Sequence, residues 1–265
     1  MKMFVTERRN KILELLNERQ RMTVQELAAS LGVSEATLRS DLNKMEKEGQ
    51  LTRTHGGAIL NDVKGNETSF SARVKRNQKE KLLIAEKAFS FIEKEQCILL
   101  DASSTALSFA EFLKDKHIRL TVVTSSVKTA MELNENPNIT VILIGGMMTK
   151  GSSSIEGIMG SNILDQLNID IMFTSANGFT PETGLSDFNL YEVQLKREMV
   201  NKAKMVVGLI DHTKIGFNSS AVFAKPHQIH TIITDRELTE DIMIHPSMKG
   251  IQIIATSINM KFQNP

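Results

Sequence analysis

The sequence has little cysteine, since Cys97 is the only one among 265 residues. A lone cysteine cannot form an internal disulfide, and no apolar run reaches the roughly 20 residues that span a bilayer. We also find no signal peptide, so we expect a soluble protein of the reducing cytoplasm that has no membrane partner. Cys97 lies in the apolar run CILLD, where we expect it to be buried as a small hydrophobic residue.

Tryptophan is absent, and the formal net charge is only +1. The hydrophobic share of 41% supports packed cores built from Leu, Ile, Val, Met and Phe. The small net charge excludes a polycation that binds nucleic acid through its total charge. Any affinity for DNA must therefore come from local placement of basic residues and from doubling of the binding unit by dimerisation.

The usual signs of cofactor and metal chemistry are also missing. The sequence has no P-loop and no glycine fingerprint for a dinucleotide. Its six histidines lack ligand spacing with one another or with Cys97. We therefore expect neither a cofactor nor a bound metal.

The most informative segment that is present runs from 23 to 57. Thr23 and Glu26 have the spacing of a capping box, which predicts the start of a helix. Gly32 predicts the end of that helix, and Ser34 predicts the cap of a second one. A strand, a glycine turn and another strand follow. This is the layout of a winged helix-turn-helix, whose second helix enters the major groove of DNA.

The second helix is expected to have one apolar and one polar face. Leu38, Leu42 and Met45 recur at helical spacing and predict the face that packs on the core. Our candidates for DNA contact lie on the polar face, at the helix caps and on the wing: Thr23, Ser34, Glu35, Thr37, Arg39, Ser40, Asn43, Arg53, Thr54 and His55. The alternative for arginines is a solvated surface charge, which the whole spacing pattern disfavours.

This segment resembles the signature of the DeoR family of bacterial transcription regulators. The residues that carry the resemblance are Ser34, Thr37, Arg39, Asp41, Leu42, Leu51, His55, Gly56 and Gly57. The family usually has two consecutive arginines on the recognition helix, whereas here Ser40 follows Arg39.

The rest of the chain divides by composition. A helix is predicted over 6–19, and residues 1–60 are expected to form the DNA-binding domain. Residues 61–80 are predicted to be a linker, polar at first and then basic. The basic stretch 71–81 is compatible with the start of a solvated helix, which we favour, or with a segment that shields DNA phosphates. From 81 to 265 short apolar strands alternate with helices, which predicts an α/β domain with a mostly parallel sheet covered by helices on both faces. The predicted strands are 97–101, 120–126, 139–146, 169–176, 204–211, 231–235 and 251–256.

Ligands of open α/β sheets bind at the carboxyl ends of the strands. Our candidate binding residues at these ends, and on the helix that follows, are Asp101, Ser103, Ser104, Thr105, Thr124, Ser125, Gly145, Gly146, Asn177, Gly178, Glu192, Lys196, Asp211 and Lys214. Hydroxyl and N–H groups at 101–105 suit an anion at a helix N-terminus, although an ordinary helix cap explains that loop equally well. Glu192 and Lys196 are also compatible with a surface ion pair, and Lys214 with a surface charge.

These loops resemble the sensor half of the DeoR family, which shares its fold with ribose-5-phosphate isomerase and coenzyme A transferases. The resemblance implies a bound phosphorylated sugar and a homo-dimer or homo-tetramer. It implies a phosphate cradle at Asp101, Ser103, Ser104 and Thr105 with Lys214 as the cation, a floor of Gly145, Gly146 and Gly178, and a rim of Glu192 and Lys196. The family commonly has glycine where Ala102 or Ser103 stands, and aspartate where Asn177 stands.

An isomerase needs a general base near its substrate. The loop 175–179, SANGF, has no carboxylate, and Glu192 would serve only if its helix turned toward the pocket. We therefore predict a transcription regulator, a repressor of a carbohydrate operon that binds an operator in double-stranded DNA and is controlled by a phosphorylated sugar, and not an enzyme. The alternatives are an active sugar-phosphate isomerase fused to a DNA-binding head and a helix-turn-helix used only for protein contacts.

Overall fold

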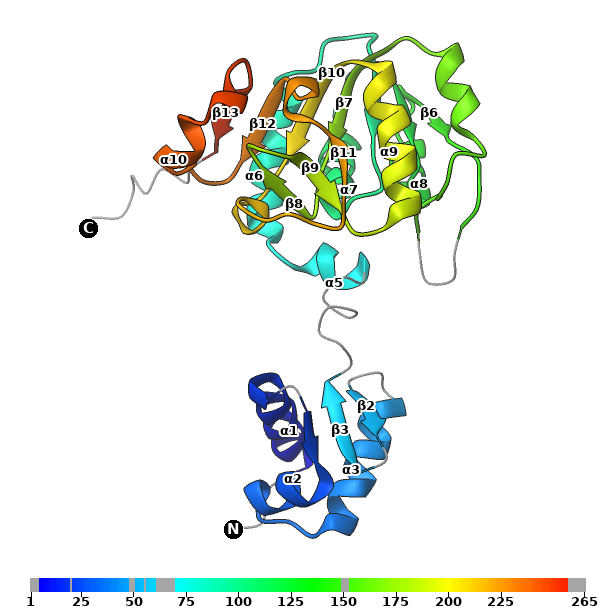
Figure 1. The fold of residues 1–265 in the computed structure, drawn as a ribbon. Helices are drawn as coiled ribbons and strands as arrows, with labels where there is room; N and C mark the ends of the chain where they lie inside the picture. The colour runs from blue at the N-terminus through cyan, green and yellow to red at the C-terminus, as the bar shows by residue number, and fades with distance from the viewer. Residues whose placement is uncertain are drawn as a thin grey trace, which may run out of the picture. The chain divides into compact units, whose positions relative to one another are not determined.

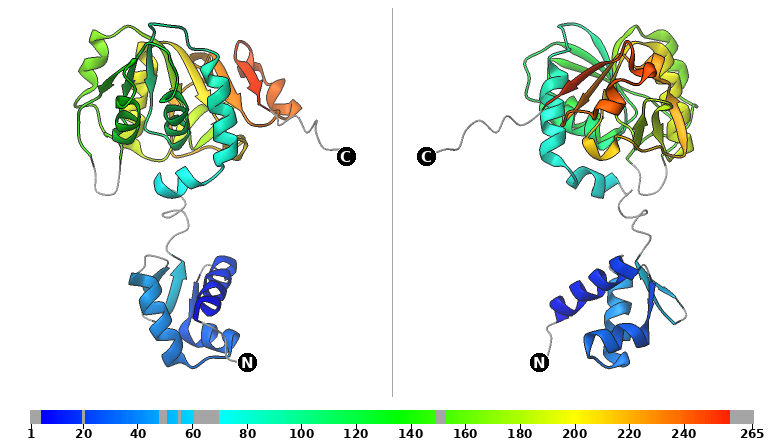
Figure 2. Two further views of the ribbon diagram at one scale, coloured as in Figure 1. Left: turned by 180° about the vertical axis from the view of Figure 1, so that it is seen from behind. Right: turned by 60° about the vertical axis from the view of Figure 1, so that its left-hand side comes forward.

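The computed structural model describes residues 5–19, 21–47, 51–54, 56–60, 70–148 and 153–256. The chain forms two compact units that divide between Arg73 and Val74 (Figures 1 and 2). Each unit has its own apolar core, so we describe the two separately.

Among its described residues up to Leu60, the first unit combines three helices with a small antiparallel sheet. Its elements, in chain order, are α1 (Val5–Arg19), β1 (Arg21–Thr23), α2 (Val24–Leu31), α3 (Glu35–Lys47), β2 (Leu51–Thr54) and β3 (Gly57–Leu60). The sheet has the order β1-β3-β2, which means that the predicted hairpin is joined by a third strand from the segment before α2. The winged helix-turn-helix layout is therefore present.

Local sequence signals explain where these helices begin and end. Both hydrogen bonds of the Thr23–Glu26 capping box are formed at the start of α2. Gly32 follows α2 with φ of 64°, a left-handed conformation that glycine adopts without strain. Leu38, Leu42 and Met45 are fully buried, so the predicted apolar face of α3 is confirmed.

The second unit is built on one sheet of seven parallel strands. The strands are β4 (Cys97–Leu100), β5 (Leu120–Thr124), β6 (Ile139–Leu143), β7 (Ile169–Thr174), β10 (Ala203–Leu209), β12 (Thr231–Thr234) and β13 (Gln252–Ala255). Their order is β13-β12-β10-β7-β4-β5-β6, and each neighbouring pair is parallel. All seven predicted strands are thus confirmed as members of one sheet, and the fold class is α/β as expected.

Helices cover both faces of this sheet (Figures 1 and 2). Ile98 and Val122 belong to the core under α6 (Gln78–Phe89), α7 (Ser104–Leu113) and α8 (Val127–Asn134). Leu99 and Val123 point to the opposite face, into the core under α9 (Leu190–Lys202). Strands buried on both faces need apolar side chains at every position, which is why their sequences read as continuous runs.

A second, small antiparallel sheet lies beside α9 and was not predicted. It consists of β8 (Gly178–Thr180), β9 (Gly184–Asp187) and β11 (Ala221–Ala224) in the order β11-β9-β8. The remaining short elements are η1 (Ser161–Gln166), η2 (His212–Lys214), η3 (Pro226–Gln228), α10 (Glu240–Met243) and η4 (Pro246–Met248). Strands of three or four residues are too short to show a period in sequence.

Two expectations about individual segments need comment. Residues 61–69 lie outside the described residues, but 70–80 form α5 (Phe70–Lys75) and the start of α6. Cys97 is only partly buried, because it is the first residue of β4 and not in the middle of the strand. Among the described residues, no helix is long and apolar enough to cross a membrane.

Candidate functional site

The surface of α3 carries most of the residues predicted to contact DNA. Glu35, Arg39, Ser40 and Asn43 are exposed, as their helical spacing predicts. Ser34 caps the helix by accepting a hydrogen bond from the backbone N–H of Thr37 at 3.3 Å. The N-cap of α3 and the polar face of this helix are therefore arranged as the sequence predicts.

Two arginines of this unit, the exposed Arg39 and the half-buried Arg53, are oriented by neighbouring side chains. Arg39 Nη2 lies 2.8 Å from Glu35 Oε2, one turn earlier on α3. Arg53, on β2, donates from Nη1 to Asn43 Oδ1 at 2.5 Å, while its backbone N–H donates to Glu46 at 2.9 Å. The wing strand is therefore held against α3, and the two arginines lie on one surface of this unit.

The other residues predicted to contact DNA differ in their exposure and in their hydrogen bonds. Thr54 is exposed on β2, and His55 lies outside the described residues. The Thr23 hydroxyl accepts from Glu26 N–H at 3.1 Å in the capping box, so its described role is to start α2. Asp41 is buried and bonded to Arg8 at 2.6 Å, which ties α3 to α1.

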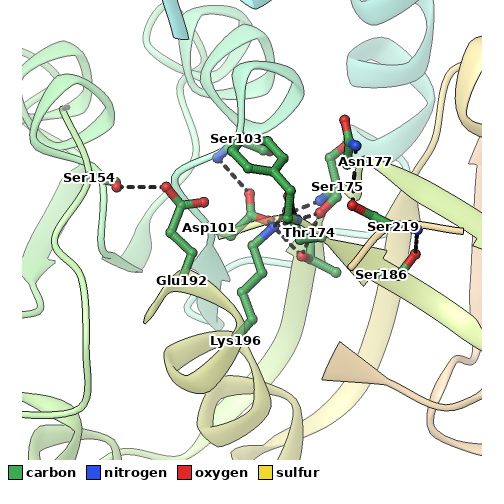
Figure 3. A network of polar contacts seen from close by, with 12 residues as sticks. Asp101, Ser103, Ser154, Thr174, Ser175, Asn177, Ser186, Glu192, Lys196 and Ser219 are labelled. Carbon is green, nitrogen blue, oxygen red and sulfur yellow. Dashed lines mark hydrogen bonds and ion pairs between the residues drawn. The ribbon is translucent and has the colours of Figure 1, made fainter. Parts of the chain in front are cut away.

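A buried ionic cluster occupies the carboxyl end of the large sheet (Figure 3). Lys196, on α9, is only 4% exposed and lies 3.0 Å from Asp101 and 2.9 Å from Asp187. It also donates to the carbonyl of Ser175 at 2.9 Å. Burial opposes the ammonium charge, but the attraction of the two aspartates outweighs it and raises the pKa of Lys196.

The carboxylate of Asp101 has hydrogen-bond partners on every side. It accepts from Ser103 N–H at 3.0 Å, from the Thr174 hydroxyl at 2.6 Å and from Ser175 N–H at 3.1 Å. Burial raises the pKa of this carboxyl, but Lys196 and these hydrogen bonds more than offset burial and hold the pKa below its usual value. Asp101 therefore fixes the loops after β4 and β7, and its oxygens do not face an open space.

The N-termini of α7 and α8 lie beside this cluster, because these helices follow the adjacent strands β4 and β5. Ser103 caps α7 by accepting from Ala106 N–H, and Ser126 caps α8 by accepting from Thr129 N–H, both at 3.1 Å. Ser104 and Thr105 are buried in the first turn of α7. Thr124 and Ser125 are also buried, and Thr124 Oγ1 accepts from Ser126 N–H.

Glu192 lies between Ser154 and the Asp101–Lys196 pair (Figure 3). The Ser154 hydroxyl donates to Glu192 Oε1 at 3.0 Å. A small pocket next to this bond has a free volume of about 10 Å³ and is lined by Ala102, Ser125, Ile155, Glu192, Leu195, Lys196 and Met199. That volume is roughly what one water needs, so a larger ligand requires the pocket to open.

The positions of Glu192 and Lys196 exclude the alternative interpretation and place both residues beside the pocket. The pair is not a surface ion pair, because Lys196 is buried and its closest carboxylates are Asp101 and Asp187. Lys196, which the resemblance places at the rim of the pocket, is buried and belongs to the pocket lining. Glu192 does line the pocket, so α9 is turned in the direction that the sequence left open.

Among the described residues, no hydrogen bond or ion pair joins Lys214, the predicted phosphate cation, to residues 101–105, and its role toward a ligand stays a prediction. Lys214 follows β10, and β7 lies between β10 and β4 in the sheet. Among the described residues, its side chain has no hydrogen bond or ion pair, whereas Asp211 accepts from Asn77 Nδ2 at 3.0 Å. The lysine that meets Asp101 is Lys196, which the spacing along the chain could not reveal.

The predicted glycines have different surroundings. Gly145 and Gly146 are exposed after β6. Gly178 is buried, and a Cβ there would lie 2.3 Å from the carbonyl oxygen of Phe217, so this glycine permits a close backbone approach within the fold. Asn177, next to it, donates to the Ser219 hydroxyl at 3.3 Å.

Several residues of this site were not among the candidates, and Ser154, Thr174 and Asp187 are examples. Thr174 was included in a predicted strand, where its polarity at the strand end was the available signal. Asp187 lies at the end of β9, and Ser154 forms an isolated bridge with Ser126. Neither segment has a pattern in the sequence that marks it as part of a site.

Each of the two units matches a known protein family. Residues 8–64 match the family described as DeoR-like helix-turn-helix domain, and residues 76–236 match the DeoR C terminal sensor domain. The two matches cover the α1-to-β3 unit and most of the seven-stranded unit.

Similar full-length proteins are named as transcription regulators and not as enzymes. The HTH-type transcriptional regulator GolR of Listeria innocua is 44% identical over 90% of this chain and 93% of its own length. The HTH-type transcriptional repressor GlcR of Bacillus subtilis is 32% identical over 96% of this chain and 97% of its own. The L-fucose operon activator of Haemophilus influenzae is 33% identical over 92% of this chain and 97% of its own.

Similarity to solved structures is more distant. A D-ribose-5-phosphate isomerase in complex with phospho-erythronic acid is 21% identical, with a TM-score of 0.41. The match covers 52% of this chain and 54% of that structure, which is about half of each.

Proposed function

The chain belongs to the DeoR family of transcription regulators, and on this premise we propose that it represses a carbohydrate operon and is released from DNA by a phosphorylated sugar. The first unit would bind the operator. The second unit would bind the sugar phosphate and hold two or more chains together. The divisions 1–60, 61–80 and 81–265 remain our proposed boundaries for head, linker and sensor.

The exposed face of α3 supports the DNA-binding role of the first unit. Arg39, Ser40 and Asn43 are exposed on this face, and the half-buried Arg53 of β2 donates to Asn43; all four are residue types that contact base edges and phosphates. Because the net charge is only +1, the affinity for DNA must come from such local groups. We therefore expect two heads of an oligomer to share the two half-sites of one operator.

The observation that carries the sensor assignment is the convergence of two helix N-termini on one pocket. The loops that precede α7 and α8 supply Ala102 and Ser125 to its lining, and α9 supplies Lys196. Free N–H groups at helix N-termini bind phosphate. Because the pocket now has room for about one water, we infer that ligand entry moves its wall.

This movement gives the proposal its mechanism. A ligand that binds one conformation of the sensor better shifts the population toward it. If that conformation holds the heads at a spacing that fits the operator less well, sugar-phosphate binding weakens DNA binding, and DNA weakens sugar-phosphate binding by the same factor.

A thermal-shift screen of the purified chain tests the sensor assignment. Ligands that bind only the native state raise the melting temperature by mass action. We expect one or more hexose or pentose phosphates to raise it, whereas the unphosphorylated sugars do not. An equal response to a sugar and to its phosphate would contradict the anion site.

A further inference from the structure

A second groove of the sensor unit lies between the start of α6 and the end of α7, on the face of the large sheet opposite α9. Its free volume is about 470 Å³, and none of its lining residues is a candidate for effector binding. Two apolar side chains in it are incompletely covered, since Leu82 is 47% exposed and Phe112 is half-buried. This α6–α7 groove is lined by Val74, Gln78, Leu82, Ser108, Glu111, Phe112, Asp115 and Lys116.

The two sides of the α6–α7 groove carry opposite charges. Its acidic side consists of Glu111 and Asp115, which are both exposed. Its basic side consists of Lys75, Arg76 and Lys79, which are exposed at the end of α5 and the start of α6. Lys75 and Lys79 each directly follow a lining residue. In the part of the chain that the structure describes, no ion pair joins the basic side to a carboxylate of its own chain.

The acidic side is only partly compensated by cations of its own chain. Lys116, the basic residue of the lining, has its ammonium group 4.0 Å from the centroid of the Phe112 ring, a cation–π contact. Burial and the neighbouring carboxylate of Glu132 raise the pKa of Glu111, and nearby lysines offset this only in part. A cation supplied from outside the chain would therefore stabilise the charged form of Glu111.

A surface with opposite charges on the two sides of an apolar groove is complementary to itself. A twofold axis through the groove places the basic side of each copy against the acidic side of the other, so every charge pair occurs twice. The side chains of Leu82 and Phe112 would then be covered at the centre, with the charges around them, as in other protein interfaces.

We propose that the α6–α7 groove is a dimer interface, in which the basic side of one chain pairs with the acidic side of a second copy of this chain. The inference rests on the proposed function, in which an oligomer presents two heads to the two half-sites of one operator, and it adds the surface that joins the copies. The groove thus has a protein partner, whereas the pocket beside α9 has the effector.

Charge reversal on each side tests this interface. The acid-reversed variant is Glu111→Lys with Asp115→Lys, and the base-reversed variant is Lys75→Glu with Lys79→Glu. Helix dipoles favour lysine near the end of α7 and glutamate near the start of α6, so both variants should fold. Each variant alone brings like charges together across the axis, and we expect its dimer dissociation constant to rise at least about tenfold. Sedimentation equilibrium measures these constants, and circular dichroism checks the fold.

Mixing the two variants provides the decisive result. In a mixed dimer both contacts again join opposite charges, so we expect a dissociation constant within about threefold of the wild-type value. Native mass spectrometry identifies the mixed species by its mass. Glu237→Lys with Glu240→Lys makes the same change of charge at exposed acids outside the groove and should leave the wild-type assembly unchanged.

Three outcomes would overturn the interface. Both reversed variants could assemble as tightly as the wild type, or the mixture could fail to restore assembly. The third is a wild-type dissociation constant that stays the same between about 50 and about 500 mM salt, since screening weakens pairs of exposed charges. If any of these is found while the effector still raises the melting temperature, the sensor assignment stands. A wild-type chain that remains monomeric and also binds no sugar phosphate would contradict the proposed function as well.

Discussion

At the scale of single residues, the second unit depends on a buried lysine between two buried aspartates. Asp101 is fully buried and Lys196 nearly so, which makes their mutual attraction strong and the loss of one partner costly. The cluster joins the loops after β4 and β7 to α9 and β9. Its role is therefore to hold in place the elements that form the pocket.

Removing the charge of Lys196 tests this role. Lys196→Met leaves Asp101 and Asp187 buried without their cation, and we expect the free energy of unfolding to fall by about 3–5 kcal/mol. Lys204→Met breaks the exposed pair with Asp170 and should cost about 0–1 kcal/mol. Urea unfolding monitored by circular dichroism measures both. Equal losses of the free energy of unfolding in the two variants would mean that the buried cluster stabilises the fold no more than an exposed ion pair does.

The pH dependence of stability has a sign fixed by the same cluster. The lowered pKa of Asp101 stabilises the native state above the ordinary aspartate pKa, about 3.9, and this contribution is lost as the pH falls through the folded-state value. The raised pKa of Lys196 stabilises the native state below about 10.4 and is lost only as the pH rises through its folded-state value.

Asp101→Asn should therefore flatten the acid side of the stability profile. Below about pH 4 the wild-type free energy of unfolding should fall more steeply than that of Asp101→Asn, by up to about 1.4 kcal/mol per pH unit. Unfolding curves at a series of acidic pH values give the two slopes. Parallel slopes would show that Asp101 does not titrate with folding.

The buried cluster also shows where sequence reasoning stops. Glu192 and Lys196 are four residues apart, and this local spacing is compatible with a surface pair as well as with the predicted binding role. The actual partners of Lys196 come from β9 and from the loop after β4, which lies 95 residues earlier in the chain. Contacts of this kind depend on the sheet order, and no spacing rule reveals them.

At the scale of elements, the sequence predicts what local chemistry determines. The capping box of α2, the glycine after it and the seven apolar strands all have strong local signals, and all are confirmed. The sheet β11-β9-β8 and strand β1 were not predicted, because strands of three or four residues are defined by their partners. β1 exists because it pairs with β3 across the unit.

The pairing of β1 with β3 depends on Gly57. A Cβ at this position would lie 2.1 Å from the carbonyl oxygen of Met22, a backbone atom that cannot move aside alone. We expect Gly57→Ala to destabilise the first unit by about 1–3 kcal/mol. Gly56→Ala is the control, since a Cβ there meets nothing within 4 Å. Hydrogen exchange of the backbone amides in β1 and α2 measures this loss of stability. Similar protection of these amides in both variants would contradict the role of Gly57.

At the scale of the whole molecule, one chain carries both a helix-turn-helix domain and a sensor domain. The family matches cover both units. The similarity to relatives that are named as regulators extends over nearly their full lengths. In the function we propose, thermodynamic coupling links the two units, because effector and operator would each change the affinity of the other by one common factor.

Arg39 tests the head of this coupled system. Arg39→Ala should weaken operator binding by about 1–3 kcal/mol if the side chain contacts a base edge. Arg236→Ala removes a similarly exposed arginine from the second unit and should have little effect. Fluorescence anisotropy with a labelled operator measures both constants. An unchanged constant for a folded Arg39→Ala protein would remove this residue from the set of DNA contacts.

The most direct measurement of the central claim is operator affinity with and without the effector. The operator is a DNA fragment that the full chain selects from a random library, and the effector is the sugar phosphate that raises its melting temperature most. At saturating effector we predict that the dissociation constant for the operator rises by about 5- to 150-fold. An operator affinity that stays the same while the sensor is saturated would contradict the account.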